Sequence, residues 1–189
     1  MEKAGIWVFA GNSKHQEDFS RAVFGLNEQS DRAAVLVTTV ILDIILTDAL
    51  KRHLHQNEKM TDALFGISGA LGDLGPKIDL AFLVGLVEAD THRDLVTVKD
   101  IRNKFAHRIS VWDFKSSSIA DLSKNLKICE KRTCSVPGPP SGWPQGCWMS
   151  LVGRDEILAD PRERFILTMQ VLCYGLSTGG VTQIPAPRF

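Results

Sequence analysis

The chain has 189 residues, of which 44% are hydrophobic and 23% charged, and its 22 basic residues balance its 22 acidic ones. A chain of this length can bury a hydrophobic core as one domain without help from disulfides or metals. The balanced charge gives the whole molecule no field that attracts nucleic acid, so any RNA or DNA contact requires a local patch.

The sequence indicates neither a targeting segment nor a metal site. The apolar stretch between Lys3 and Asn12 is too short for a secretory signal. The four cysteines are spaced C-x4-C-x12-C-x25-C, which differs from the spacing of zinc ligands. We therefore expect a cytoplasmic protein with reduced thiols, without a cofactor or a bound metal.

The first 29 residues are interpreted as an arm and a helix near residues 14–28. The longest predicted helix covers 30–56 and is almost entirely apolar in its first two thirds. A membrane span is an alternative interpretation, but Asp43 and Asp48 make insertion into a bilayer unfavourable. A helix that is apolar on nearly all sides is typical of the centre of a bundle, which is the interpretation we prefer.

Four further helices are predicted after the central one. A short helix is expected at residues 61–65, and another from Asp73 to about Glu88, with a proline in its first turn. The polar stretch "ADTHRD" is interpreted as a break before a helix that carries Leu95, Val98, Ile101 and Phe105. Ser117 or Ser118 then caps a helix that runs to about Cys129.

The last part of the chain is predicted to be a loop followed by one helix. Residues 131–159 are rich in proline and glycine, which disfavours a helix or a central strand. A closing helix at 160–180 begins with Asp160 as N-cap and Pro161 in its first position, and an unstructured tail covers 181–189. The predicted domain pattern is an arm with a first helix (1–29), a core (30–130), this loop, the closing helix and the tail. The predicted fold class is an all-α bundle of about five or six helices.

The stretch "KDIRNKFAHR", residues 99–108, carries the most chemistry in the chain. On a helix, Asn103 and His107 lie on one face, whereas Arg102 and His107 project about 140° apart. Arg102 and His107 can therefore serve one reacting atom only if the helix ends between them or if a second copy of the chain completes the site. The alternative is an ordinary polar helix end, where the helix dipole favours positive charge.

These residue types suit a phosphodiester. Histidine transfers protons near neutral pH, and arginine holds a phosphate through two parallel hydrogen bonds. Asn103 could orient the histidine or a ribose hydroxyl. Such a set could use the RNA 2′-hydroxyl as nucleophile without a metal.

Two resemblances follow from these residues. "RNKFAH" resembles the Arg-polar-x-x-x-His signature of HEPN domains, which are all-α and which, in active members, cleave RNA without a metal at a site between two protomers. The segments "SDRAAVLVTTVILDIILTDAL", "GALGDLGPKIDLAFLVGLV" and "DFKSSSIADLSKNLKIC" are similar to the mannitol operon repressor family. That similarity covers residues 30–130, and more faintly the last helix.

The resemblance implies a regulatory protein that acts through a protein partner, because no helix-turn-helix or basic arm is present. We expect a homodimer, no membrane and no direct DNA readout. The alternative is a HEPN-type ribonuclease with Arg102, Asn103 and His107 as catalytic residues and RNA as substrate.

Other polar residues are interpreted more simply. Asp43 and Asp48 do not share a helix face, so a metal pair is disfavoured, and they are candidate buried partners of Arg102 or His107. His53, His55 and His92 are interpreted as surface histidines, because no cysteine or acidic residue stands at ligand spacing. The four tryptophans are expected in packing, with stacking on single-stranded RNA as the alternative; they are Trp7, Trp112, Trp143 and Trp148.

Overall fold

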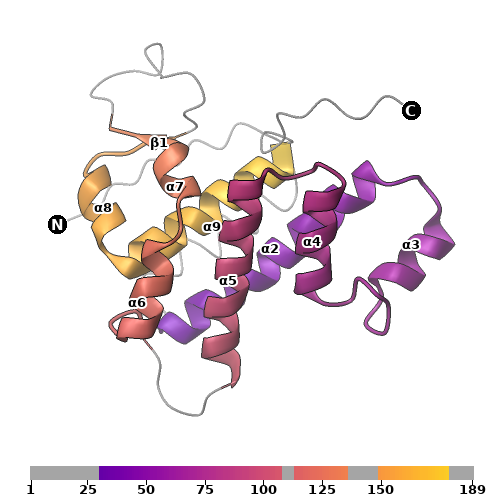
Figure 1. Cartoon of the computed structure of the whole chain (residues 1–189), viewed down its shortest axis with the longest axis horizontal. Helices are drawn as coiled ribbons and strands as arrows, with labels where there is room; N and C mark the ends of the chain where they lie inside the picture. The colour runs from indigo at the N-terminus through magenta and orange to yellow at the C-terminus, as the bar shows by residue number, and fades with distance from the viewer. Residues whose placement is uncertain (1–29, 108–112, 136–148, 179–189) are drawn as a thin grey trace.

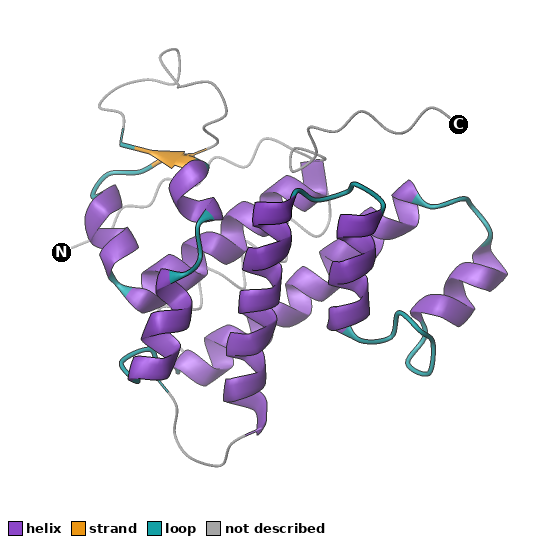
Figure 2. Cartoon of the chain, viewed as in Figure 1, coloured by secondary structure: helices purple, strands orange, loops and turns teal. Residues whose placement is uncertain are grey.

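The computed structural model describes residues 30–107, 113–135 and 149–178, and these form a helical bundle (Figures 1 and 2). The prediction of an all-α fold is confirmed. The helices are α2 (Asp31–His53), α3 (Glu58–Phe65), α4 (Leu74–Leu83), α5 (Ala89–His107), α6 (Ser117–Lys124), α7 (Ile128–Lys131), α8 (Arg154–Ala159) and α9 (Pro161–Thr178). Two short strands, β1 (Thr133–Cys134) and β2 (Met149–Ser150), pair in parallel.

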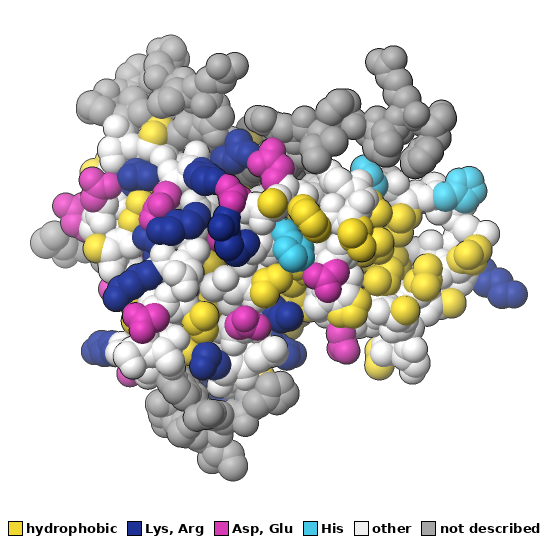
Figure 3. Space-filling model, viewed as in Figure 1, with side chains coloured by type: hydrophobic (Ala, Val, Ile, Leu, Met, Phe, Trp, Pro, Cys, Tyr) yellow, Lys and Arg dark blue, Asp and Glu magenta, His cyan; other side chains and the backbone are white. Residues whose placement is uncertain are grey.

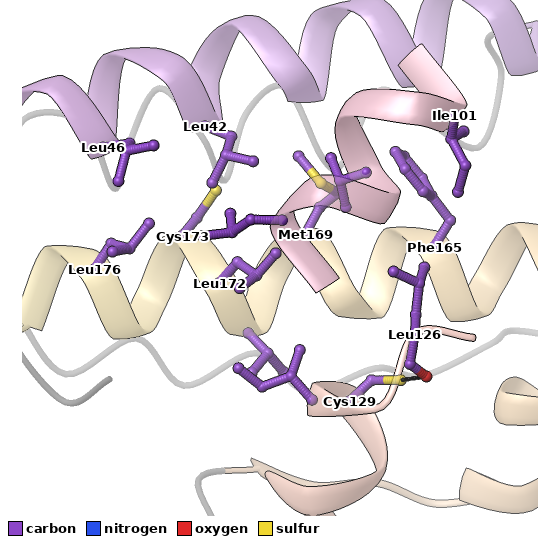
Figure 4. Packing of buried hydrophobic residues seen from close by; sticks show 14 of the residues in the cluster. Leu42, Leu46, Ile101, Leu126, Cys129, Phe165, Met169, Leu172, Cys173 and Leu176 are labelled. Atoms are coloured by element: carbon purple, nitrogen blue, oxygen red, sulfur yellow. Dashed lines mark hydrogen bonds between the residues drawn. The ribbon is translucent and has the colours of Figure 1, made fainter. Parts of the chain in front are cut away.

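Helices α2 and α9 form the centre of the bundle. At their first turns Arg162 Nε lies 3.0 Å from Asp31 Oδ1, and at their last turns Arg52 Nη2 donates to Leu176 O over 3.2 Å. The two helices therefore run in the same direction. Figure 4 shows Leu42 and Leu46 of α2 pointing toward α9, and both leucines are fully buried.

Helix α2 contacts α9, α5 and α4, as expected for a central helix. Ser30 is its N-cap, and the Ser30 hydroxyl accepts a hydrogen bond from Ala33 N. The hydroxyls of Thr38 and Thr39 donate to backbone carbonyls one turn earlier. By length and composition α2 could also cross a membrane, and half of its most apolar window is buried inside the bundle.

Helix α4 is shorter than predicted, and α5 is longer. Helix α4 ends at Leu83 instead of near Glu88, because Gly85 adopts a φ of +73° that only glycine tolerates well. The predicted break "ADTHRD" is wrong, since these residues form the first turns of α5. Thr91 and Asp94 there are buried with Leu95, so the buried face of α5 begins in a polar stretch.

The predicted helix from residue 117 to 129 is divided into α6 and α7. Ser116, rather than Ser117 or Ser118, occupies the N-cap position of α6, and Asn125 ends that helix. The chain then turns into α7, where a carboxylate oxygen of Asp94 accepts hydrogen bonds from the backbone N–H groups of Lys127 and Ile128. These two bonds to a neighbouring helix fix the turn, which local propensity did not predict.

The predicted loop at 131–159 contains more regular structure than its composition indicates. Strand β1 pairs with β2, and Leu151 N donates to Cys134 O over 3.0 Å. Helix α8 follows Gly153, whose φ of +69° again requires glycine. The interpretation of 131–159 as structureless is therefore wrong at β1, β2 and α8, and its proline-rich residues 136–148 lie outside the described residues.

The predicted start of the closing helix is confirmed. Asp160 Oδ1 accepts hydrogen bonds from Arg162 N and Glu163 N, at 2.9 and 3.0 Å, which satisfies two N–H groups of the first turn of α9. The predicted helix at 14–28, the tail at 181–189 and all four tryptophans lie outside the described residues.

Candidate functional site

The candidate site lies at the C-terminal end of α5, which two buried side chains anchor. Ile101 and Phe105, one turn apart, are 0% and 1% exposed. Phe105 packs against Phe114, with ring centroids 5.5 Å apart, and Phe114 packs in turn on Phe165 of α9. Because this face of α5 is held in the core, the intervening residues Arg102 to Lys104 project toward the surface.

Arg102 and Asn103 are joined to each other. Arg102 Nη1 donates a hydrogen bond to Asn103 Oδ1 over 3.1 Å, and both side chains are half-buried. The side-chain oxygen of Asn103 thus accepts a hydrogen bond from Arg102, and its role in orienting the histidine or a ribose hydroxyl stays a prediction. His107 is the last residue of α5, and its side chain lies outside the described residues.

The course of α5 decides how the motif residues are oriented. The helix is continuous from Ala89 to His107, so it does not end between Arg102 and His107. Five residues of α-helix turn the second Cα–Cβ bond about 140° away from the first. The side chains of Arg102 and His107 could act on one atom if the helix ended between them or if a second copy of the chain completed the site. Because the helix does not end there, only the second possibility is left.

Three helix ends meet around the motif. Arg32 Nη2 donates to Ala106 O over 3.4 Å and so satisfies a carbonyl in the last turn of α5. Asp31 accepts hydrogen bonds from Phe114 N and from Arg162 Nε, at 2.9 and 3.0 Å. The cations beside the motif thus include Arg32 and Arg162, but the Asp31 carboxylate already pairs with Arg162.

Asp43, a candidate partner of Arg102 or His107, pairs with Lys77 instead. Lys77 of α4, which is 4% exposed, donates to both carboxylate oxygens of Asp43, at 2.7 and 2.9 Å. A buried ammonium group needs such a partner, and Asp43 in the middle of α2 supplies it. Asp48, in the second half of α2, lies with Lys51, Arg52 and Gln56 around a shallow open pocket at the end of that helix.

Two histidines outside the motif make structural contacts. His53 Nε2 lies 3.1 Å from Val84 O, and His92 Nε2 lies 3.0 Å from Asp79 Oδ1. His55 is exposed. In the described ranges no three His, Cys, Asp or Glu side chains come together in a way that could hold a metal ion.

Sequence reasoning missed a buried polar cluster between α5, α7 and α9. Asp94 is fully buried, and its Oδ2 lies 2.7 and 2.6 Å from the backbone nitrogens of Lys127 and Ile128. Arg164 of α9 donates to Leu126 O and to Glu130. Burial raises the pKa of Asp94 despite the two backbone hydrogen bonds, whereas the hydrogen bond from Arg164 lowers the pKa of Glu130. The cluster joins the bundle to α7. A step of four residues back from Val98, one helical turn, would have placed Asp94 on the buried face of α5.

Sequence reasoning also missed an apolar surface. Five large side chains on α3, the turn after it and the end of α4 are exposed, and we call them the apolar surface: Met60, Leu64, Ile67, Phe82 and Leu83. Figure 3 shows apolar side chains gathered over α3 and α4, whereas charged side chains of both signs cover the face formed by α5, α6 and α7. Met60, Leu64 and Ile67 recur at helical spacing, but sequence alone does not say whether such a face is covered.

Comparisons with known proteins do not assign the chain to a family. No family model, no curated protein and no solved structure matches it.

Proposed function

We propose that the chain is a non-enzymatic regulatory protein of the mannitol operon repressor type, which acts in the cytoplasm by binding a protein partner. The proposal rests on the sequence resemblance over residues 30–130. It is compatible with the all-α fold and with the balanced charge, which gives the chain no general affinity for DNA.

The observation that favours a non-enzymatic role is the continuous course of α5 through the motif. Cleavage of a phosphodiester by this set needs a proton-transferring group and a phosphate-binding cation that face the same phosphate. Within one copy, Arg102 and His107 leave the helix in directions about 140° apart, and Arg102 is bonded to its neighbour Asn103. In this proposal the motif stabilises the end of α5.

A promoter fusion tests the regulatory role. A strain that lacks the gene would carry a reporter gene under the promoter of a neighbouring sugar-alcohol operon. The reporter transcript would contain none of the native operon sequence. The proposal predicts that loss of the gene raises reporter expression and that the wild-type gene restores repression. A reporter that does not respond, while the native operon transcript decays at a different rate, would contradict it, because only an RNA-directed activity depends on the native transcript.

A second candidate function is a HEPN-type ribonuclease, as the shorter resemblance implies. It is favoured by two arginines near the end of α5, because cations attract an RNA backbone. Arg102 lies on the last turns of α5, and Arg32 donates to Ala106 O one turn further along. His107 would then transfer the proton and Arg102 would bind the phosphate. Because α5 is continuous, this function requires a dimer in which two α5 ends face each other.

A further inference from the structure

Helix α3 is amphipathic, yet none of its residues is buried. Met60 and Leu64 lie one turn apart on this helix and are 62% and 39% exposed. Figure 1 shows α3 at one end of the molecule, beyond α2 and α4. A short helix gains most of its stability from packing of its apolar face. In α3 Phe65 packs against the core, whereas Met60 and Leu64 remain exposed.

The turn after α3 holds Ile67 in solvent. Its backbone is hydrogen-bonded, with Leu71 N donating to Leu64 O and Gly69 N to Gly66 O, both over 2.8 Å. A Cβ atom on Gly69 would lie 2.2 Å from Leu64 O, so the tight approach requires glycine. This compact turn leaves Ile67 fully exposed, at 101%, and its internal hydrogen bonds oppose folding back onto the core.

The end of α4 adds two further exposed apolar residues on this side of the molecule, where Figure 3 shows apolar side chains gathered over α3 and α4. Leu83 is 79% exposed, and Phe82 is 41% exposed although it stacks beside His92, with ring centroids 4.9 Å apart. Taking about 200 Å² for a fully exposed large apolar side chain, the five residues of the apolar surface expose on the order of 600 Å². A typical monomer has no larger apolar patch than this, and such patches commonly mark interfaces.

Two acidic side chains beside the apolar surface have partners within the chain. Asp62 of α3 lies 3.9 Å from Lys51 Nζ, and Asp79 of α4 lies 3.0 Å from His92 Nε2. The exposed apolar area also approaches the roughly 800 Å² that each partner contributes to a standard interface.

From these observations we infer that the apolar surface docks onto the same surface of a second copy of this chain, forming a two-fold symmetric dimer. A two-fold interface uses one patch on both copies, so α3 and the end of α4 of each copy cover those of the other. Figure 1 shows α3 well away from the C-terminal end of α5. This dimer therefore does not bring the two copies of Arg102 together, and the inference goes beyond the proposed regulatory function.

Sedimentation equilibrium of the full-length protein at micromolar concentrations tests the dimer. The double variant Ile67→Ser/Leu83→Ser removes four large apolar side chains per dimer, and we expect its dissociation constant to rise at least about tenfold. Both residues are mostly exposed, so circular dichroism should show an unchanged fold. Val152→Ser is the matched control, because Val152 is 91% exposed but precedes α8, far along the chain from this surface.

Arg102→Ala separates this dimer from one formed through the motif. The inference predicts a dimer for wild type, Val152→Ser and Arg102→Ala, and a weakened dimer for Ile67→Ser/Leu83→Ser only. A monomeric wild type would overturn it, since the surface would then have another occupant, such as residues 1–29 or a different protein. A dimer that loses affinity in Arg102→Ala but not in the double variant would overturn it as well.

Discussion

Replacement of Asp94 by alanine should destabilise the fold strongly. Asp94 is 0% exposed, and its Oδ2 accepts hydrogen bonds from two backbone N–H groups at the start of α7. Alanine removes this acceptor from both N–H groups, and each buried N–H group left without a partner costs about 1–3 kcal/mol. Burial disfavours the charged form of the Asp94 carboxyl group, so its removal regains part of the lost stability. We therefore expect the free energy of unfolding to fall by about 2–4 kcal/mol.

Asp94→Asn is the matched variant, because it keeps one oxygen acceptor and removes the charge. Burial raises the pKa of Asp94 in the folded protein above its unfolded value. The stability contributed by this carboxyl group is therefore greatest below the unfolded pKa and is lost as pH rises through the folded pKa. The asparagine variant lacks this loss, so its stability relative to wild type should improve as pH increases across that interval.

Urea unfolding followed by circular dichroism measures both effects. At neutral pH, Asp94→Ala should lose more stability than Asp94→Asn, and a pH series should show the relative gain of the asparagine variant. A loss below about 1 kcal/mol for Asp94→Ala would refute the assignment of Asp94 as the residue that fixes α7. A relative loss for Asp94→Asn with rising pH would refute the sign of the pKa shift.

Three further predictions follow from single residues. Lys77→Met removes the cation that pairs with Asp43, and because Asp43 is partly exposed we expect a loss of about 1–2 kcal/mol in urea unfolding. Gly69→Ala should cost about 1–2 kcal/mol in the same assay, since its Cβ would clash with the α3 backbone, whereas Gly75→Ala should be tolerated because the nearest atom is 3.8 Å away. Burial raises the pKa of the Cys173 thiol, so iodoacetamide should leave it unmodified in the folded protein and modify it after unfolding, as read by mass spectrometry.

The fold class could be predicted because the signals that define it are local. The apolar length of α2 and the capping residue Asp160 of α9 identify two central helices without any tertiary information. The beginning of α5 could not be predicted in the same way, since Thr91 and Asp94 are polar residues on its buried face. Asp94 can be buried because it accepts hydrogen bonds from the backbone of α7, and the sequence alone does not reveal such bonds between helices.

The candidate site could be predicted in composition but not in geometry. The sequence placed Arg102 and Asn103 on a helix near its end, and the structure places them there. It did not reveal that Arg102 bonds to Asn103, or that Asp43 pairs with Lys77, because both depend on which side chains neighbouring helices bring close. The apolar surface was likewise hidden, since amphipathic spacing is the same for a covered and an uncovered helix face.

Cleavage of a labelled RNA by the purified protein in EDTA tests the non-enzymatic assignment most directly, with His107→Ala and Arg102→Ala beside wild type. The proposed non-enzymatic function predicts no cleavage of a broad panel of substrates by any of the three proteins. Cleavage by wild type that both substitutions abolish, with the fold intact by circular dichroism, would contradict it and make the end of α5 an active site.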